Sequence, residues 1–119
     1  MLKSKIHRAR VTETRLHYEG SISIDSSLME YAQILPYEKV EIYNINNGSR
    51  FFTYAIPTIP HSGEIQINGA AARLAQKDDL IIIASYVMVP DDELKQFKPR
   101  IIQVNLQNQA EPERVVRET

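Results

Sequence analysis

Residues 39–56 read Lys39-Val40-Glu41-Ile42-Tyr43-Asn44-Ile45-Asn46-Asn47-Gly48-Ser49-Arg50-Phe51-Phe52-Thr53-Tyr54-Ala55-Ile56. In the first half, Val40 and Ile42 alternate with Glu41 and Tyr43, which is the period of two that a half-buried strand shows. The segment 46–48 favours a type I′ hairpin turn, because asparagine and glycine accept positive φ angles. Residues 49–56 then form the returning strand, so this stretch predicts a β-hairpin.

Further short strands are predicted on both sides of this hairpin. They cover residues 2–11, 15–19, 22–24, 64–67, 80–89 and 101–106, with a turn at 12–14. The strand at 80–89 has the most apolar sequence and is expected to be the most buried. So many short strands in one small domain indicate a mainly β fold closed into a barrel.

Three short helices are predicted between these strands. The first begins at a capping box formed by Ser27 and Glu30 and runs to about Ile34. The second covers 70–75, and the third begins at Pro90, a residue that suits the first turn of a helix.

The composition indicates one globular domain. The chain has 119 residues, of which 43% are hydrophobic and 24% are charged, values that are ordinary for a globular protein. We expect a single domain over residues 1–106. From Gln107 onward the sequence is polar and charged, so a disordered tail is predicted over 107–119.

Charge and hydropathy argue against several classes of protein. The formal net charge of −1 is unfavourable for binding nucleic acid by electrostatic attraction. No apolar run approaches the roughly 20 residues of a membrane-spanning helix. The basic residues near the N-terminus are not followed by an apolar segment, so we expect no signal peptide and a cytoplasmic location.

The sequence contains no familiar motif for a bound cofactor. There is no cysteine, and His7, His17 and His61 lie in separate segments without the spacing of metal ligands, so no metal site is expected. Neither a GxGxxG motif nor a Walker loop is present. An electrophilic cofactor based on a nucleotide would therefore have no predicted binding site.

Two segments each allow a structural and a functional interpretation. Lys3, Lys5 and His7 share one face of their strand, either as an edge protected by lysines or as an anion site. The amides that start the helix after Asn68-Gly69 could bind a carboxylate, or the helix could be a plain connection. The pattern alone favours the structural interpretation of both segments.

Five segments together resemble one family, the bacterial pyruvoyl-dependent aspartate 1-decarboxylases. They are Lys5-Ile6-His7-Arg8, Leu16-His17-Tyr18-Glu19-Gly20-Ser21, the stretch from Asn47 to Ile56, Asn68-Gly69-Ala70-Ala71-Ala72 and Ile82-Ile83-Ala84-Ser85-Tyr86. The resemblance implies a six-stranded double-psi β-barrel with short capping helices. It also implies a homotetramer with active sites between subunits, which makes β-alanine for pantothenate and coenzyme A.

The resemblance implies that the chain cuts itself between Gly20 and Ser21. Ser21 would attack the Gly20 carbonyl, and Thr53 would assist at the oxyanion. Glycine suits position 20 because it has no Cβ to obstruct the attack. The products would be a β chain of residues 1–20 and an α chain of 21–119 that begins with a covalent pyruvoyl group. Whether cleavage is spontaneous or needs a maturation factor is left open.

The resemblance also assigns roles in decarboxylation. The amine of L-aspartate would form a Schiff base with the pyruvoyl group, which takes the electron-sink role that pyridoxal phosphate has elsewhere. Tyr54 would donate the proton to the resulting carbanion. The remaining assignments are Arg50 with Lys5 for a substrate carboxylate, Thr53 and the backbone of Gly69, Ala70 and Ala71 for substrate binding, and His7 and Asn68 as possible support.

Two points about Arg50, Thr53 and Tyr54 can be argued from physics. Arg50 is expected to bind the β-carboxylate, because holding the departing α-carboxylate as an anion would stabilise the ground state. Arg50 and Tyr54 share one face of an ideal strand, whereas Thr53 points to the other. A bulge, a strand end or a site between subunits would reconcile these positions with one active site.

Two other functions are weighed against the decarboxylase. One is a catalytically silent double-psi barrel that serves as a binding or scaffold module, in which Ser21 stays intact. The other is a nucleic-acid-binding barrel that uses Lys3, Lys5, Arg8, Arg10 and Arg15. The near-neutral charge argues against the second.

Overall fold

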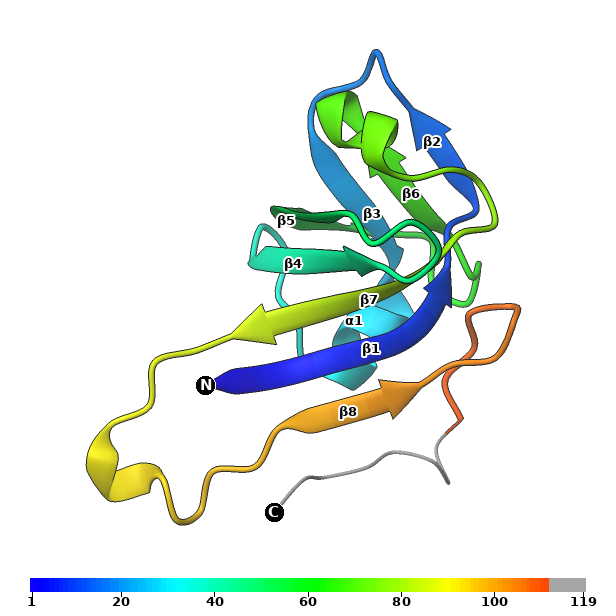
Figure 1. The fold of residues 1–119 in the computed structure, drawn as a ribbon. Coiled ribbons are helices and arrows are strands. Elements are labelled where there is room, and N and C mark those ends of the chain that lie inside the picture. Colours follow the sequence, from blue (N-terminus) through cyan, green and yellow to red (C-terminus); the bar gives the residue numbers. More distant parts are fainter. Residues whose placement is uncertain (112–119) are drawn as a thin grey trace.

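A computed structural model describes residues 1–111 of the chain, and these form a mainly β protein with a few short helices (Figure 1). The strands are β1 (Leu2–Arg10), β2 (Glu13–Arg15), β3 (Ser21–Asp25), β4 (Lys39–Asn44), β5 (Arg50–Thr58), β6 (Ile65–Asn68), β7 (Leu80–Tyr86) and β8 (Arg100–Gln103). They join in one sheet with the order β2-β6-β3-β5-β4-β7-β1-β8. The helices are α1 (Ser26–Ala32) and the 3-10 helices η1 (Gly69–Leu74) and η2 (Asp91–Glu93).

The predicted hairpin is present as β4 and β5, which pair in register from Lys39↔Tyr54 to Tyr43↔Arg50. Its turn is not of type I′, because Gly48 is the only residue of the turn with a positive φ, at 78°. The buried side chain of Asn44 accepts a hydrogen bond from the Asn46 amide at 2.9 Å, and the Gly48 amide bonds back to the Asn44 carbonyl at 2.9 Å. These bonds make a longer turn than the Asn-Gly pair predicts.

Strand β7 is buried as expected, because it pairs with both β4 and β1. Its side chains Ile81 and Ile83 are fully buried, and they belong to a core of aliphatic residues from most of the strands. The strand ends at Tyr86 rather than Val89. The chain beyond it projects from the body with η2 before it returns as β8 (Figure 1).

The strand predicted at 15–19 is instead β2, at 13–15, where a turn was predicted. Strand β2 pairs in parallel with β6, from Glu13↔Gln66 to Arg15↔Asn68. Residues 16–20 have no strand partner and form an exposed turn. Tertiary pairing with β6 therefore decides where this strand lies.

Asp25, rather than the predicted Ser27–Glu30 box, caps helix α1. Its carboxylate accepts hydrogen bonds from the Ser27 amide at 2.8 Å, the His61 amide at 3.0 Å and the Gly63 amide at 2.9 Å. Burial acts to raise the pKa of Asp25, but the hydrogen bonds outweigh it and hold the pKa below its ordinary value. The helix ends at Ala32, because Gln33 takes the left-handed conformation with φ 59°.

Strand β1 is not an edge strand, so the structural interpretation of its lysines is wrong. It pairs antiparallel with β7 and parallel with β8. Its register with β7 shifts between Ile6 and Ala9, where Arg8 has φ 66°. This bulge interrupts the alternation of faces after His7.

The first part of the predicted tail, residues 107–111, is hydrogen-bonded to the rest of the domain. Asn108 is buried, and its side chain bonds to the Arg10 amide at 2.7 Å, the Arg10 carbonyl at 2.8 Å and the Gly63 carbonyl at 2.8 Å. These bonds attach the end of the described chain to β1. The rest of the predicted tail, 112–119, lies outside the described residues.

Within residues 1–111, no helix has the length and apolar character needed to cross a membrane.

Candidate active site

Strand pairing places three of the predicted residues in one row. Ser21 of β3 lies opposite Asn68 of β6, and Ile22 of β3 lies opposite Ala55 of β5. Residues directly opposite on paired strands have neighbouring side chains. Extended by one residue before the Ile22–Ala55 pair, the same register would set Ser21 level with Tyr54, so we take Tyr54, Ser21 and Asn68 as a candidate row across three strands.

The Gly20–Ser21 bond lies where an exposed turn enters the buried sheet. Residues 16–20 are exposed, whereas the Ser21 residue is only 7% exposed. The peptide bond is thus reachable from solvent on one side, and the serine hydroxyl is held in a defined environment on the other.

Asn68 holds the Ser21 hydroxyl and has capacity left for another partner. Its side-chain amide donates to Ser21 Oγ at 3.0 Å and to Ser23 Oγ at 3.1 Å. Its Oδ1 is buried and has no hydrogen-bond partner among residues 1–111. A buried polar atom without a partner is costly, so it marks a place where a reacting group or substrate could bind.

Beyond the neighbouring residues in the chain, the steric need for glycine falls on Gly69. A Cβ at Gly20 would meet no atom within 4 Å. A Cβ at Gly69 would lie 2.6 Å from Gly20 Cα, 2.7 Å from Gly20 N and 3.0 Å from the Tyr18 carbonyl oxygen. Gly69 also has φ +75°, in the left-handed region that glycine tolerates best.

Gly69 begins helix η1, and Ala70 and Ala71 follow it. The predicted helix is present, as a 3-10 helix that starts next to the Gly20–Ser21 bond. Ala70 is exposed and Ala71 is partly buried, so the backbone here can be reached from outside the domain.

Strand β5 alternates regularly, and this places Thr53 on the opposite face from Arg50 and Tyr54. Arg50, Phe52 and Tyr54 are exposed, whereas Thr53 is partly buried and Ala55 is fully buried. The β4–β5 register has no shift, and β5 continues to Thr58, so neither a bulge nor a strand end brings the two faces together.

The two cations predicted to bind substrate are free of acidic partners within the described residues. Arg50 lies over the Tyr43 ring at 4.5 Å and is exposed. Lys5 is partly buried and forms no ion pair in this part of the chain. By contrast, Glu38 binds the neighbouring Lys3 through both oxygens, at 2.8 and 2.9 Å.

Along the sheet of one protomer, neither cation is a direct neighbour of Ser21. Arg50 precedes Tyr54 by four residues on β5, which corresponds to about 13 Å along a strand. Lys5 of β1 pairs with Ala84 of β7, which is level with Glu41 of β4 and Phe52 of β5. The path along the sheet from Lys5 to β5 therefore crosses β7 and β4 and measures about 14 Å.

His7 is a candidate supporting residue on the same strand as Lys5. Its Nδ1 is buried and has no partner among the described residues. Burial lowers the pKa of His7, and the charges of Lys5 and Arg8 lower it further. A lowered pKa favours the neutral imidazole, which can both donate and accept a hydrogen bond.

Two features were missed from the sequence. Ser23 shares the Asn68 amide with Ser21, which the i, i+2 spacing of the two serines on one strand could have suggested. Tyr43 lies under Arg50 and shares a hydrogen bond with the Tyr86 hydroxyl at 2.7 Å. Burial first, and then this hydrogen bond, raise the pKa of Tyr43 to about 12.

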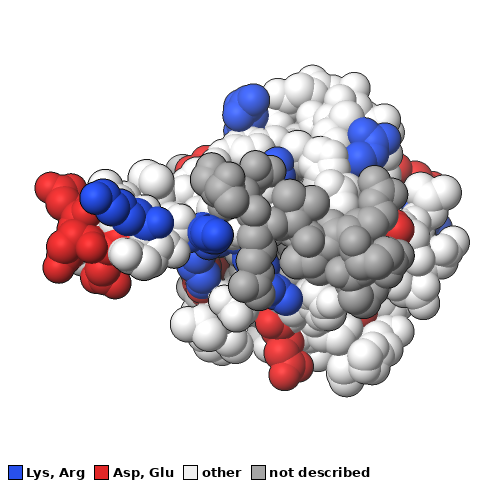
Figure 2. All heavy atoms as spheres, turned by 90° about the horizontal axis from the view of Figure 1, so that it is seen from below, with Lys and Arg blue, Asp and Glu red and all other residues white. Residues whose placement is uncertain are grey.

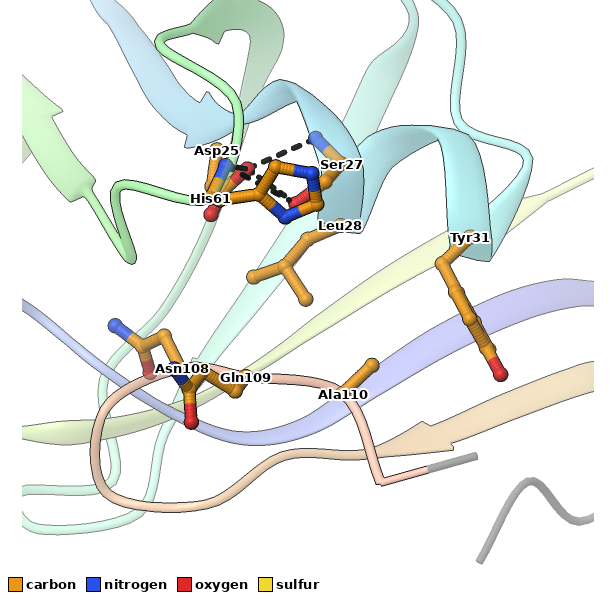
Figure 3. A pocket seen from close by; sticks show the side chains of 8 residues that line it. All are labelled: Asp25, Ser27, Leu28, Tyr31, His61, Asn108, Gln109 and Ala110. Atoms are coloured by element: carbon orange, nitrogen blue, oxygen red, sulfur yellow. Dashed lines mark hydrogen bonds between the residues drawn. The ribbon is translucent and has the colours of Figure 1, made fainter. Parts of the chain in front are cut away.

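A separate pocket of about 390 Å³ lies beside α1 (Figure 3). Its lining residues are Asp25, Ser27, Leu28, Tyr31, His61, Asn108, Gln109 and Ala110. It contains none of the predicted site residues, and its buried polar groups, Asp25 and Asn108, are already bonded within the fold. We therefore place the candidate site at the Tyr54–Ser21–Asn68 row.

Comparison with known proteins gives one consistent result. The family model described as aspartate decarboxylase matches residues 1–111. The aspartate 1-decarboxylase of Syntrophus aciditrophicus is 62% identical over 109 residues, covering 92% of this chain and 94% of that protein. The enzymes of the same name from Thermoanaerobacter pseudethanolicus and Methylobacillus flagellatus are 59% identical over 108 residues and 51% over 114. They cover 91% and 96% of this chain, and 92% and 90% of their own lengths.

Proposed function

This chain belongs to the aspartate decarboxylase family, and we propose that it is an aspartate 1-decarboxylase, a carboxy-lyase that converts L-aspartate to β-alanine and CO₂. The product serves pantothenate and hence coenzyme A synthesis. The observation that carries this proposal is the family match over residues 1–111. The row of Tyr54, Ser21 and Asn68 at the Gly20–Ser21 bond supports it.

We propose that the cofactor is a covalent pyruvoyl group made from Ser21. The residues present fit such a group. Asn68 already bonds to Ser21 and has an unpartnered Oδ1, and Gly69 leaves room for the backbone at Gly20. Once formed, the group would supply an electrophilic ketone that accepts electrons during decarboxylation. Neither a metal nor pyridoxal phosphate is part of the proposal.

In the proposed maturation, the Ser21 hydroxyl oxygen attacks the Gly20 carbonyl carbon. A carbon–oxygen bond forms and the peptide bond breaks, so that the nitrogen of residue 21 becomes a free amine. Loss of the Cα proton then releases Gly20 as a carboxylate and leaves dehydroalanine. Water converts this to the pyruvoyl group with loss of ammonia.

The neighbouring residues have distinct roles in this proposal. We assign Thr53, which precedes Tyr54 on β5, to the oxyanion that forms at the Gly20 carbonyl, because a hydroxyl can stabilise that charge. Tyr54 belongs to the candidate row with Ser21, and its phenolic hydroxyl is a group that can donate a proton there.

Substrate binding is assigned to Arg50, Lys5 and the backbone of 69–71. Arg50 and Lys5 lack acidic partners in the described chain, and a guanidinium can bind a carboxylate through two hydrogen bonds. We assign the β-carboxylate to Arg50, because the α-carboxylate must leave.

We propose that the fold is the six-stranded double-psi barrel of the family. The consecutive strands β6, β3, β5, β4, β7 and β1 would form it. The Thr12 amide, just beyond β1, bonds to the Ile65 carbonyl at 2.8 Å, and the Ile65 amide bonds to Thr12 Oγ1 at 3.0 Å. These bonds join the two ends of the six-strand series and so support closure.

We further propose a homotetramer with the active site between subunits. The separation of Lys5 from Tyr54 within one protomer supports this, because a second copy could supply the missing cation. Exposed aromatic side chains on and beside β5 also favour such an interface, with Phe52 65% and Tyr37 76% exposed. The cytoplasmic location stays a prediction.

Intact mass under denaturing conditions tests the proposal. We expect two chains, of residues 1–20 and 21–119, with the second beginning with pyruvoyl, and CO₂ release from L-aspartate. Ser21→Ala should abolish both cleavage and activity. A Ser21→Ala protein that is still cut would contradict the mechanism, and a wild-type chain that neither cuts itself nor releases CO₂ would contradict the function.

The scaffold alternative predicts an intact Ser21 and no CO₂ release, so the same experiment decides it. The nucleic-acid alternative is weakened because three of its five basic residues are already paired with carboxylates. Lys3, Arg10 and Arg15 form ion pairs with Glu38, Asp78 and Glu13. On the face drawn in Figure 2, basic groups are scattered and several stand next to acidic ones.

A further inference from the structure

We infer that Ser23 is a positioning residue, which holds the Asn68 side chain beside position 21 after Ser21 has given up its hydroxyl. The inference rests on the maturation proposed above. Its starting point is the shared hydrogen bonding of the Asn68 amide, at 3.0 Å to Ser21 Oγ and 3.1 Å to Ser23 Oγ.

Strand geometry explains why both serines reach the same amide. Ser21 and Ser23 are two residues apart on β3 and so lie on the same face, while Ile22 and Ile24 are buried in the core. Asn68 is directly opposite Ser21, and it is the diagonal neighbour of Ser23, whose own partner is Gln66. A diagonal neighbour is within reach of a polar side chain.

Maturation removes one of the two partners. The Ser21 oxygen leaves as part of the Gly20 carboxylate, and Cβ of residue 21 becomes a methyl group that cannot accept a hydrogen bond. Ser23 is then the only hydrogen-bond partner of the Asn68 side chain that remains from the described residues, because Oδ1 has none. Asn68 is 4% exposed, so water is poorly placed to replace a lost bond.

The position of Asn68 matters because it faces the reacting residue across the β3–β6 pair. A polar group beside a reaction centre contributes most when its orientation is fixed in advance. Ser23 does not need to touch the substrate for this. It acts through Asn68, by keeping the amide in the orientation that the Ser21 hydroxyl set during maturation.

An uncleavable variant tests the hydrogen bond directly. Ser21→Ala replaces the hydroxyl with a hydrogen, so a methyl group stands at Cβ as it does after maturation. The probe is the side-chain amide signal of Asn68 in a ¹⁵N–¹H spectrum, assigned by its loss in an Asn68→Asp variant. We expect slow exchange with water in Ser21→Ala and about tenfold faster exchange in Ser21→Ala/Ser23→Ala, the factor for one hydrogen bond.

Ser26→Ala in the same background is the matched control, because the Ser26 hydroxyl forms no hydrogen bond within the described residues. It should leave the Asn68 signal unchanged. If the signal and its exchange rate are the same with and without the Ser23 hydroxyl, the inference is wrong.

The matured enzyme gives an independent readout. For Ser23→Ala we expect kcat to fall about tenfold with KM within about twofold, since the substrate cations are untouched. Cleavage should slow less than kcat, because Ser21 still holds Asn68 in the precursor. Ser23→Thr retains the hydroxyl and should restore kcat.

A Ser23→Ala enzyme with wild-type kcat would overturn the inference while leaving the proposed function intact. Failure of the proposed function shows separately, as a wild-type chain that neither cleaves nor releases CO₂. The exchange measurement on Ser21→Ala is independent of both, because that protein needs neither cleavage nor activity.

Discussion

Gly69 has the strictest steric requirement of the residues around the Gly20–Ser21 bond. An added Cβ would collide with Cα and N of Gly20, which are backbone atoms and cannot rotate away as a side chain can. The positive φ of +75° adds strain for any residue other than glycine. Helix η1 can therefore approach the Gly20–Ser21 bond, the proposed cleavage site, only because residue 69 is glycine.

Gly69→Ala should slow self-cleavage by roughly 100-fold, because it displaces Gly20 from the attack geometry. Mass spectrometry of freshly purified protein over time measures this. Gly48→Ala is the control, since Gly48 has a similar φ of +78° but open space around its Cβ. Equal cleavage rates in Gly69→Ala and wild type would show that the crowding at Gly20 is unimportant.

Tyr54→Phe should leave self-cleavage near the wild-type rate but lower kcat by roughly 100-fold, as expected for loss of a proton donor. The ring remains to stack against Tyr37, whose centroid is 6.3 Å away, so packing is retained. Steady-state CO₂ release by fully cleaved enzyme is the measurement. Wild-type kcat in this variant would exclude Tyr54 as the donor.

At the level of elements, two polar side chains hold segments that are distant in sequence. Glu38, between α1 and β4, binds Lys3 of β1 and the Leu35 amide, and its other oxygen bonds to Ser85 of β7. Asn108 attaches the loop after β8 to β1 and to Gly63. Strand pairing does not hold the loops that contain Glu38 and Asn108. These two side chains attach the loops to the sheet instead.

Glu38 should make stability depend on pH. Burial acts to raise the pKa of Glu38, but the hydrogen bonds from Lys3 and Ser85 outweigh it and lower the pKa. A lowered carboxylate pKa contributes stability that is present above the ordinary glutamate value of 4.5 and is lost as the pH falls through the lower value of the folded state.

In a Ser21→Ala background, which avoids cleavage, Glu38→Gln should lower the free energy of unfolding by about 1–3 kcal/mol at pH 7. This difference should shrink as the pH falls below 4.5. Urea denaturation at several pH values measures it, with the exposed Glu30→Gln as control. A difference that is independent of pH would contradict the assigned cause.

Asn108→Ala removes three hydrogen bonds to the backbone and should lower the free energy of unfolding by about 2–4 kcal/mol in the same background. Gln107→Ala should change it by less than about 0.5 kcal/mol, because that side chain is exposed. Similar effects of the two substitutions would mean that the loop after β8 contributes little to stability.

For the whole molecule, the proposed site between subunits can be tested by complementation. Lys5→Ala and Arg50→Ala should each be nearly inactive. When the two chains are expressed together, about a quarter of the sites would combine an intact Arg50 from one chain with an intact Lys5 from another. Activity near that fraction is expected, and none at all would place both cations in one protomer.

Much of this protein could be predicted from local sequence. The alternation of Val40 and Ile42, the apolar run at 80–84 and the turn at 46–48 each indicate their element, because burial on one face and turn chemistry act over a few residues. The resemblance of the motifs around Ser21 to a known family indicated the chemistry. The mainly β fold and the decarboxylase family were both predicted correctly.

The errors concern features that long-range pairing decides. Glu13–Arg15 became a strand because β6 was available beside it, and Asp25 capped α1 because it also receives the amides of His61 and Gly63. Asn108 was assigned to a tail because its partners, Arg10 and Gly63, are far away in sequence.

By itself, then, the sequence determined the family and most of the strands and singled out Ser21 as the proposed reacting residue, since these depend on residue type and local spacing. Only the tertiary structure placed Asn68 against Ser21 and Ser23, and Gly69 against Gly20. Asn68 and Ser21 are 47 positions apart, and their contact follows from the register of β3 on β6. That register is set by burying Ile22, Ile24, Ile65 and Ile67 on the same side of the sheet.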